Sequence, residues 1–222
     1  MKKILILLLC GCLLTACGNS EKSESSISET SSLVIAEGEL GEVITPDESD
    51  KDYNLGEYRY SSSGTKLYFN EDEYPKELML TLEKYFNAFA ENDFETYKSC
   101  LSPLYAEKMN AYLEGNYNYG LETSFDKQRE GLSEKMGGDF KITRIRAEKT
   151  EEDNEKAIEE YFSDLNDFFG DDFYSEVKEN SDKFYHMTFF VIAEDSENVE
   201  SLLLSEYEII FAEKDGNYYT FV

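Results

Sequence analysis

A sharp change in composition at Tyr53 most constrains what this chain of 222 residues can fold into. No aromatic residue precedes that position, whereas 32 Tyr and Phe side chains lie from there onward. From Gly18 to Asp52 the chain is rich in Ser and Glu and carries ten acidic residues against two lysines. Such a stretch buries too little apolar surface to offset the entropy that ordering removes. We therefore expect a disordered linker over residues 17–52 and one domain over residues 53–222.

Apolar spacing within residues 53–222 predicts helices first and strands later. Helical spacing occurs over residues 78–90, 94–101, 103–109, 121–136 and 158–169. Strand patterns occur in a hairpin over 58–69 and then over 140–149, 184–193, 202–213 and 218–222. Asp93 is a good N-cap, Gly137 a helix end, and Asp215-Gly216 between two alternating runs a strong hairpin signal. This order predicts an α+β domain with an antiparallel sheet.

The segment 84–97 reads as helix, acidic turn and helix, with Glu91-Asn92-Asp93 at the turn. Together with the closing hairpin at Asp215-Gly216-Asn217, it resembles the opening and end of NTF2-like domains. The resemblance covers about residues 78–222 and implies N-terminal helices packed on a strongly curved antiparallel sheet, the shape of a cone. The helix at 158–169 would be an insertion in that fold, or the mark of a variant sheet order. Because this fold carries many activities, it implies no particular one.

The N-terminal residues carry a separate signal. Lys2 and Lys3 precede an apolar run from Ile4 to Leu14, which has the length of a signal-peptide core, about 7–15 residues. A spanning helix needs about 20 apolar residues, so the run is too short for one. One interpretation is an ordinary secretory signal cleaved after Ala16. The other rests on Leu14-Thr15-Ala16-Cys17, which resembles the lipobox of bacterial lipoproteins.

The lipobox resemblance implies that residues 1–16 are removed and that Cys17 carries a diacylglyceryl group. Two acyl chains hold a protein stably in a bilayer, whereas one holds it only marginally. We therefore expect a cell-membrane protein, lipid-anchored through Cys17 on the extracytoplasmic face. Cys10 and Cys12 would leave with the signal, so that Cys100 would be the one remaining thiol and no intrachain disulfide could form. We expect Cys100 to be a small buried residue.

The net charge of −27 limits the partners of this chain. So acidic a protein repels nucleic-acid phosphates and anionic lipid headgroups. We therefore expect no nucleic-acid partner, and contact with the membrane through the lipid on Cys17. The sequence contains no phosphate-binding glycine loop and no zinc spacing, and the acids around Asp164 and Asp172 fail the calcium-loop pattern. We expect neither cofactor nor metal.

Two residues are candidates for a ligand pocket. His186 is the single histidine and lies in the strand expected at 184–193. In a cone pocket it could act as a general base, but it could also be a hydrogen-bonded residue at the edge of the core. Tyr112 lies near Tyr117 and Tyr119 beside a polar loop, where tyrosines can stack on an amphipathic ligand or simply fill the rim of the core.

These observations favour a membrane-anchored lipoprotein with a non-catalytic domain that binds a small molecule or a protein. Two alternatives stay open at this point. The domain could be an extracytoplasmic enzyme of NTF2-like type that uses His186, or it could be an accessory subunit of a membrane complex.

Overall fold

The computed structural model describes residues 35–150 and 154–222. The predicted signal peptide and Cys17 lie outside these residues. The helices of the part described are the short 3-10 helix η1 (Tyr53–Leu55), α1 (Lys76–Glu91), α2 (Phe94–Cys100), α3 (Pro103–Tyr117), α4 (Leu121–Met136), α5 (Asn154–Phe169) and α6 (Phe173–Glu179). The strands are β1 (Arg59–Tyr60), β2 (Lys66–Tyr68), β3 (Phe140–Lys149), β4 (Lys183–Asp195), β5 (Glu200–Lys214) and β6 (Asn217–Thr220).

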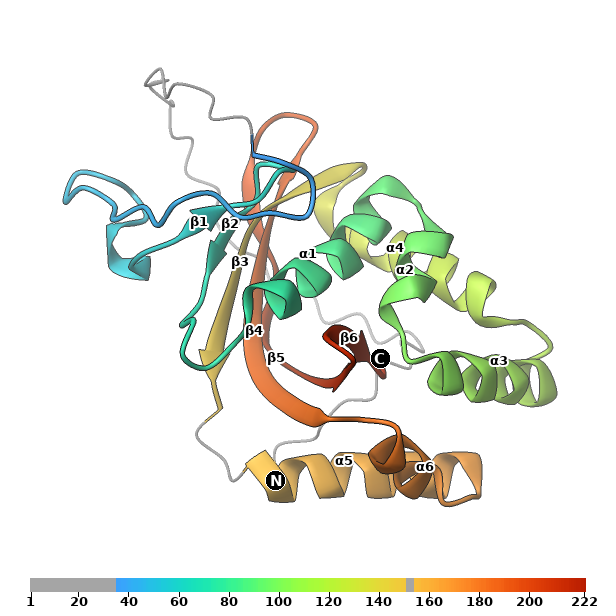
Figure 1. The fold of residues 1–222 in the computed structure, drawn as a ribbon. Coiled ribbons are helices and arrows are strands. Elements are labelled where there is room, and N and C mark those ends of the chain that lie inside the picture. The colour runs from blue at the N-terminus through green and yellow to red at the C-terminus, as the bar shows by residue number, and fades with distance from the viewer. Residues whose placement is uncertain (1–34, 151–153) are drawn as a thin grey trace.

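The strands form a single sheet in the order β1 to β6. Neighbours are antiparallel except β2 and β3, which run parallel. A parallel pair needs a long crossover, and α1 to α4 supply it. Strands β4 and β5 bend strongly (Figure 1), and register shifts interrupt their pairing between Phe189 and Ile192, as bulges do where a sheet curls. The predicted α+β class with helices on a curved sheet is confirmed; the parallel pair was not predicted.

Helix α1 lies across the hollow of this sheet (Figure 1). Its apolar residues recur every three or four positions, so Leu78, Leu82, Phe86 and Phe89 face one way and are buried. The ring centroid of Phe86 lies 5.3 Å from that of Phe189 in β4. Each such side chain contributes about 1.5–3 kcal/mol when it is fully buried. The helix predicted over 78–90 thus contributes a continuous row of side chains to the core.

Local capping signals act as the sequence predicts. Helix α1 ends at Asn92, whose φ of 57° is left-handed, and Asp93 then caps α2 by accepting a hydrogen bond from Thr96 N at 3.0 Å. Helix α4 ends at Gly137 with φ of 79°. In the described residues no helix combines the length and apolar character needed to cross a bilayer.

Residues 35–52 are part of the domain, although their composition predicts a linker. Leu40 bridges Ser61 and Ile44 bridges Tyr58, so this segment pairs along the outer side of β1. Asp52 is only 2% exposed. The ordered part therefore begins before Tyr53, because main-chain hydrogen bonds and buried charge pairs replace the apolar contacts that this segment lacks. For residues 17–34 the linker stays a prediction.

The connection from β3 to β4 holds two helices where one was expected. Helix α5 covers the predicted span 158–169 and starts somewhat earlier. Helix α6 was not predicted. It has only seven residues, of which Phe173 and Val177 are buried, and two apolar positions are too few to show a helical period. The ring of Phe162 in α5 stacks on Tyr174 in α6 with centroids 4.7 Å apart, which joins the two helices.

Candidate functional site

The hollow of the sheet is filled by side chains. The cavity that remains there, between α1, α4, β4 and β5, measures about 30 Å³ and is walled by Phe86, Phe89 and Phe189 among others. A space of this size holds about one or two water molecules. The described structure therefore favours a site elsewhere than in the cone.

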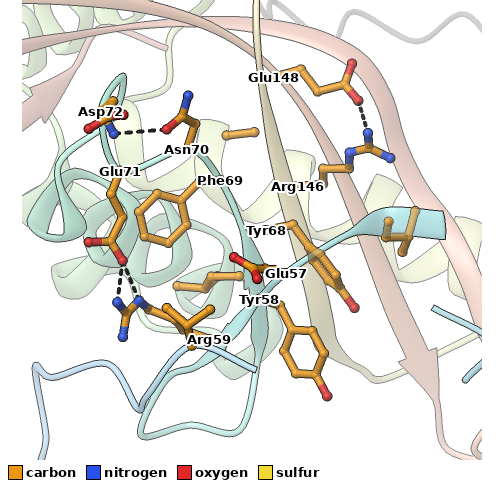
Figure 2. A pocket seen from close by; sticks show the side chains of 14 residues that line it. Glu57, Tyr58, Arg59, Tyr68, Phe69, Asn70, Glu71, Asp72, Arg146 and Glu148 are labelled. Carbon is orange, nitrogen blue, oxygen red and sulfur yellow. Dashed lines mark hydrogen bonds and ion pairs between the residues drawn. The ribbon is translucent and has the colours of Figure 1, made fainter. Parts of the chain in front are cut away.

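A much larger cavity, of about 640 Å³, opens at the β1 edge of the sheet. We call it the β1–β2 cavity. Pockets for small ligands usually measure about 300–1,000 Å³, so its size is suitable. Its walls come from the N-terminal segment, β1, β2 with the turn that follows it, and β3, and consist of Val43, Leu55, Glu57, Tyr58, Arg59, Leu67, Tyr68, Phe69, Asn70, Glu71, Asp72, Arg146, Ala147 and Glu148 (Figure 2).

Three aromatic side chains, together with four aliphatic ones, form the apolar part of the β1–β2 cavity wall. Tyr58 comes from the residue before β1, Tyr68 from the end of β2, and Phe69 from the next position. The rings of Tyr58 and Tyr68 lie 5.2 Å apart, and the ammonium group of Lys66 sits 4.6 Å from the centroid of Tyr58. This wall already holds one cation against an aromatic face, the contact that attracts ammonium and guanidinium groups.

Two ion pairs flank the aromatic wall, one on each side in Figure 2. Arg59 lies 2.5 Å from Glu71 and also donates to the carbonyl of Gly41 at 2.7 Å. Arg146 lies 2.8 Å from Glu148. Both guanidinium groups are thus occupied by carboxylates of the cavity itself. An anionic ligand would have to displace one of these carboxylates to reach an arginine.

The tyrosine hydroxyls of the cavity stay protonated at neutral pH. Burial raises the pKa of Tyr58, and the neighbouring Tyr60 adds to this. Burial also raises the pKa of Tyr68, with a further contribution from the charge of Asp52. The Tyr68 hydroxyl is buried and has no hydrogen-bond partner of normal geometry in the part of the chain described. These groups are therefore hydrogen-bond donors rather than bases.

A buried charge network holds the N-terminal wall in place. Asp52 Oδ2 lies 2.6 Å from Lys66 Nζ in β2 and 3.3 Å from Arg144 Nε in β3. Arg144 in turn binds both carboxylate oxygens of Glu200, at 2.6 and 2.8 Å, and Lys51 binds Glu200 at 2.6 Å. Burial opposes ionisation of Asp52, but the Lys66 hydrogen bond and the charge of Arg144 outweigh it and lower its pKa. The network ties the chain before η1 to three strands.

A second wide cavity, of about 820 Å³, lies among α2, α3, α4 and β6. Its walls carry four carboxylates, none of which forms an ion pair within the described residues, and one cation, Lys98. Unpaired acids are common on a chain of net charge −27. This groove resembles the rest of the acidic surface, whereas the β1–β2 cavity has an aromatic wall and two of its four carboxylates are paired with arginines.

The two predicted pocket residues line none of these three cavities. His186 is 3% exposed; its Nδ1 lies 3.4 Å from Thr150 Oγ1 and its Nε2 lies 3.5 Å from Glu208 Oε2. Alternation along β4 places it on the face opposite Phe189, away from the hollow. It is the hydrogen-bonded histidine at the edge of the core that one of the two interpretations expected.

Tyr112 is engaged in aromatic packing within the domain. Its ring centroid lies 3.8 Å from that of Phe168 in α5 and 6.1 Å from that of Tyr117. The side chain thus joins α3 to α5 and fills the rim of the core. Of the three tyrosines considered together, Tyr117 is the most exposed, at 41%.

Sequence reasoning missed the residues that form the β1–β2 cavity. One signal was available, because Arg144, Arg146 and Glu148 alternate with apolar residues in β3 and mark a polar face. The sequence does not predict which segment covers that face, because the covering segment, residues 35–52, has the composition of a linker.

Comparison with protein-family models, with curated proteins and with solved structures gave no match. The NTF2-like family and the lipoprotein class therefore stay predictions from the sequence.

Proposed function

We propose that the chain is a lipoprotein of the extracytoplasmic face, anchored to the membrane through Cys17, whose domain binds a ligand in the β1–β2 cavity without catalysing a reaction. The observation that carries the binding function is the cavity of about 640 Å³ with an aromatic wall between two ion pairs. Within the part of the chain that the structure describes, its walls contain no histidine, cysteine, serine or lysine. The acid–base groups of these walls are four carboxylates, two of which are held by arginines, and tyrosine hydroxyls that stay protonated at neutral pH.

The anchor rests on Leu14-Thr15-Ala16-Cys17 and on the short apolar run before it. It is tested by labelling cells with an alkyne analogue of palmitate and separating membranes from soluble protein. Cys17→Ala should lose the label and appear in the soluble fraction. Cys12→Ala, a matched change in the same region, should keep both the label and the membrane location. Membrane retention of Cys17→Ala would refute the lipid anchor.

The binding function is tested by native mass spectrometry of the full-length protein, gently extracted from the membrane of its own host. We expect a bound mass on the wild type. Val43→Trp narrows the cavity from a position that is 47% exposed, and should abolish the bound mass. Val199→Trp, at a position 43% exposed and outside the cavity walls, should retain it. A wild type without any bound mass, or a mass kept by Val43→Trp, would contradict binding at this cavity.

A further inference from the structure

The β1–β2 cavity opens where two strands stop pairing. Strands β1 and β2 are joined at Arg59–Leu67 and Tyr60–Lys66. The same register would place Glu57 opposite Phe69, yet within the described residues no backbone hydrogen bond joins these two. Both residues line the cavity, one from each side. The cavity therefore occupies the gap between the two strands, which diverge beyond the Arg59–Leu67 pair, on the side of Glu57 and Phe69.

Main-chain groups of this gap point into it. In an extended strand these groups point alternately to the two neighbours. Tyr58 exchanges hydrogen bonds with Ile44 on the outer side, at 2.8 and 3.1 Å, so the main-chain groups of its neighbours point to the β2 side, where Arg59 pairs with Leu67 and Glu57 has no partner strand among the described residues. By the same alternation, those of Phe69 point back toward β1. Unpaired N–H and C=O groups along a strand are a template for another strand.

The side chains around the gap select a positively charged occupant. The walls hold four carboxylates and two arginines. Each arginine is paired with one carboxylate, and the remaining two, Glu57 and Asp72, are exposed and form no ion pair in the described part of the chain. The lining thus carries a net charge of −2, that is two arginines minus four acids. The charge of the whole chain, −27, further attracts cations toward it.

We propose that the β1–β2 cavity is the docking site for a basic segment of another protein, bound in extended conformation as an added strand between Glu57 and Phe69. This proposal rests on the binding function proposed above for the same cavity. Main-chain hydrogen bonds to the open strand edges supply affinity, as in other cases of strand addition. Lys or Arg side chains of the partner reach Glu57 and Asp72, and their stems lie on Tyr58 and Phe69.

The test is selection of a random eight-residue peptide library, displayed on phage, on the full chain. Three proteins are compared: the wild type, Glu57→Lys/Asp72→Lys, and the control Asp126→Lys/Glu130→Lys. The control makes the same change in net charge at exposed positions of α4, outside the cavity. We expect the wild type and the control to enrich the same Lys- and Arg-rich sequences and the cavity variant to lose them.

The most enriched peptide is then synthesised with and without N-methyl groups on alternate residues, which remove main-chain donors. We expect N-methylation to weaken binding about tenfold or more, because several main-chain hydrogen bonds are lost together. We also expect the unmodified peptide to shift the amide NMR signals of Glu57 and Phe69. The proposal would be overturned if the wild type enriched no basic peptides, or if the cavity variant bound them equally well. It would also be overturned if the peptide kept its affinity both when the odd and when the even residues were N-methylated. If that happened, a small molecule bound to the wild type in native mass spectrometry would still support the binding function. A wild type without bound mass would refute both the binding function and the docking of a basic segment.

Discussion

At the scale of single residues, burial controls the reactivity of Cys100. Its side chain is 1% exposed, and its thiol donates to the carbonyl of Thr96 at 3.4 Å. Burial raises the pKa of the thiol to about 11. The thiolate is the reactive species, so little of it exists at neutral pH. The expectation of a small buried residue is confirmed.

Cys100 should therefore resist thiol reagents in the folded protein. In a chain with Cys10, Cys12 and Cys17 changed to serine, reaction with a chromogenic disulfide at pH 8 should be about a hundredfold slower than in urea. Ser99→Cys in a Cys100→Ala background is the matched control, because Ser99 is exposed, and it should react quickly. Rapid labelling of Cys100 without denaturant would contradict this burial.

Asp52 is the residue whose loss should cost the most stability among the charged groups around the cavity. Its carboxylate is 3% exposed and neutralises Lys66 and Arg144 together. Asp52→Asn leaves two partly buried cations with one partner fewer. We therefore expect the free energy of unfolding to fall by about 2–3 kcal/mol, which is at or just below the lower end of what the loss of one partner of a buried ion pair costs. Urea unfolding measures it. Asp47→Asn, an exposed change in the same segment, should leave the midpoint nearly unchanged.

Acid should weaken the fold through the same network. For Glu200, burial opposes ionisation, but the Lys51 hydrogen bond and the charge of Arg144 outweigh it and lower its pKa, as they do for Asp52 with Lys66. A carboxylate with a lowered pKa in the folded state stabilises it fully above the unfolded values of 3.8 and 4.5. That contribution disappears as pH falls below them. Urea titrations from pH 7 to pH 3 should show a shallower decline for Asp52→Asn than for the wild type, and parallel declines would exclude the network as a cause.

At the scale of elements, caps decide where the helices around the hollow begin. Asp93 accepts hydrogen bonds from Thr96 N at 3.0 Å and Thr96 Oγ1 at 2.7 Å, and the first of these lowers its pKa most. Asp172 holds the same position before α6 but makes no capping bond through its side chain.

Asp93→Ala should therefore lower the urea midpoint, whereas Asp172→Ala should leave it almost unchanged. Both substitutions remove one carboxylate from a helix N-terminus, so they alter the helix-dipole interaction alike. The difference between them isolates the hydrogen bond. Equal effects of the two substitutions would show that charge, rather than capping, accounts for the loss.

At the scale of the whole molecule, the segment before η1 is part of the folded unit. It pairs with β1 at two bridges and brings Asp52 into the sheet. A chain that starts at Tyr53 loses these contacts, and we expect its Tm to be about 5–10 °C below that of a chain that starts at Ile35. Differential scanning calorimetry of the two chains tests this. Equal Tm values would show that residues 35–52 do not stabilise the domain and act only as a linker.

Periodicity in the sequence determined the helices α1 and α5, the β5–β6 turn and the α+β class, because spacing and capping are local properties of neighbouring residues. Tertiary structure alone decided which distant segments come into contact. The pairing of 40–44 with 58–61, the parallel β2–β3 contact and the charge network of Asp52 join residues far apart in the chain. No local pattern encodes such contacts, and the cavity between β1 and β2 exists only because of them. His186 and Tyr112 were chosen for their residue type, whereas packing decided that both serve the core.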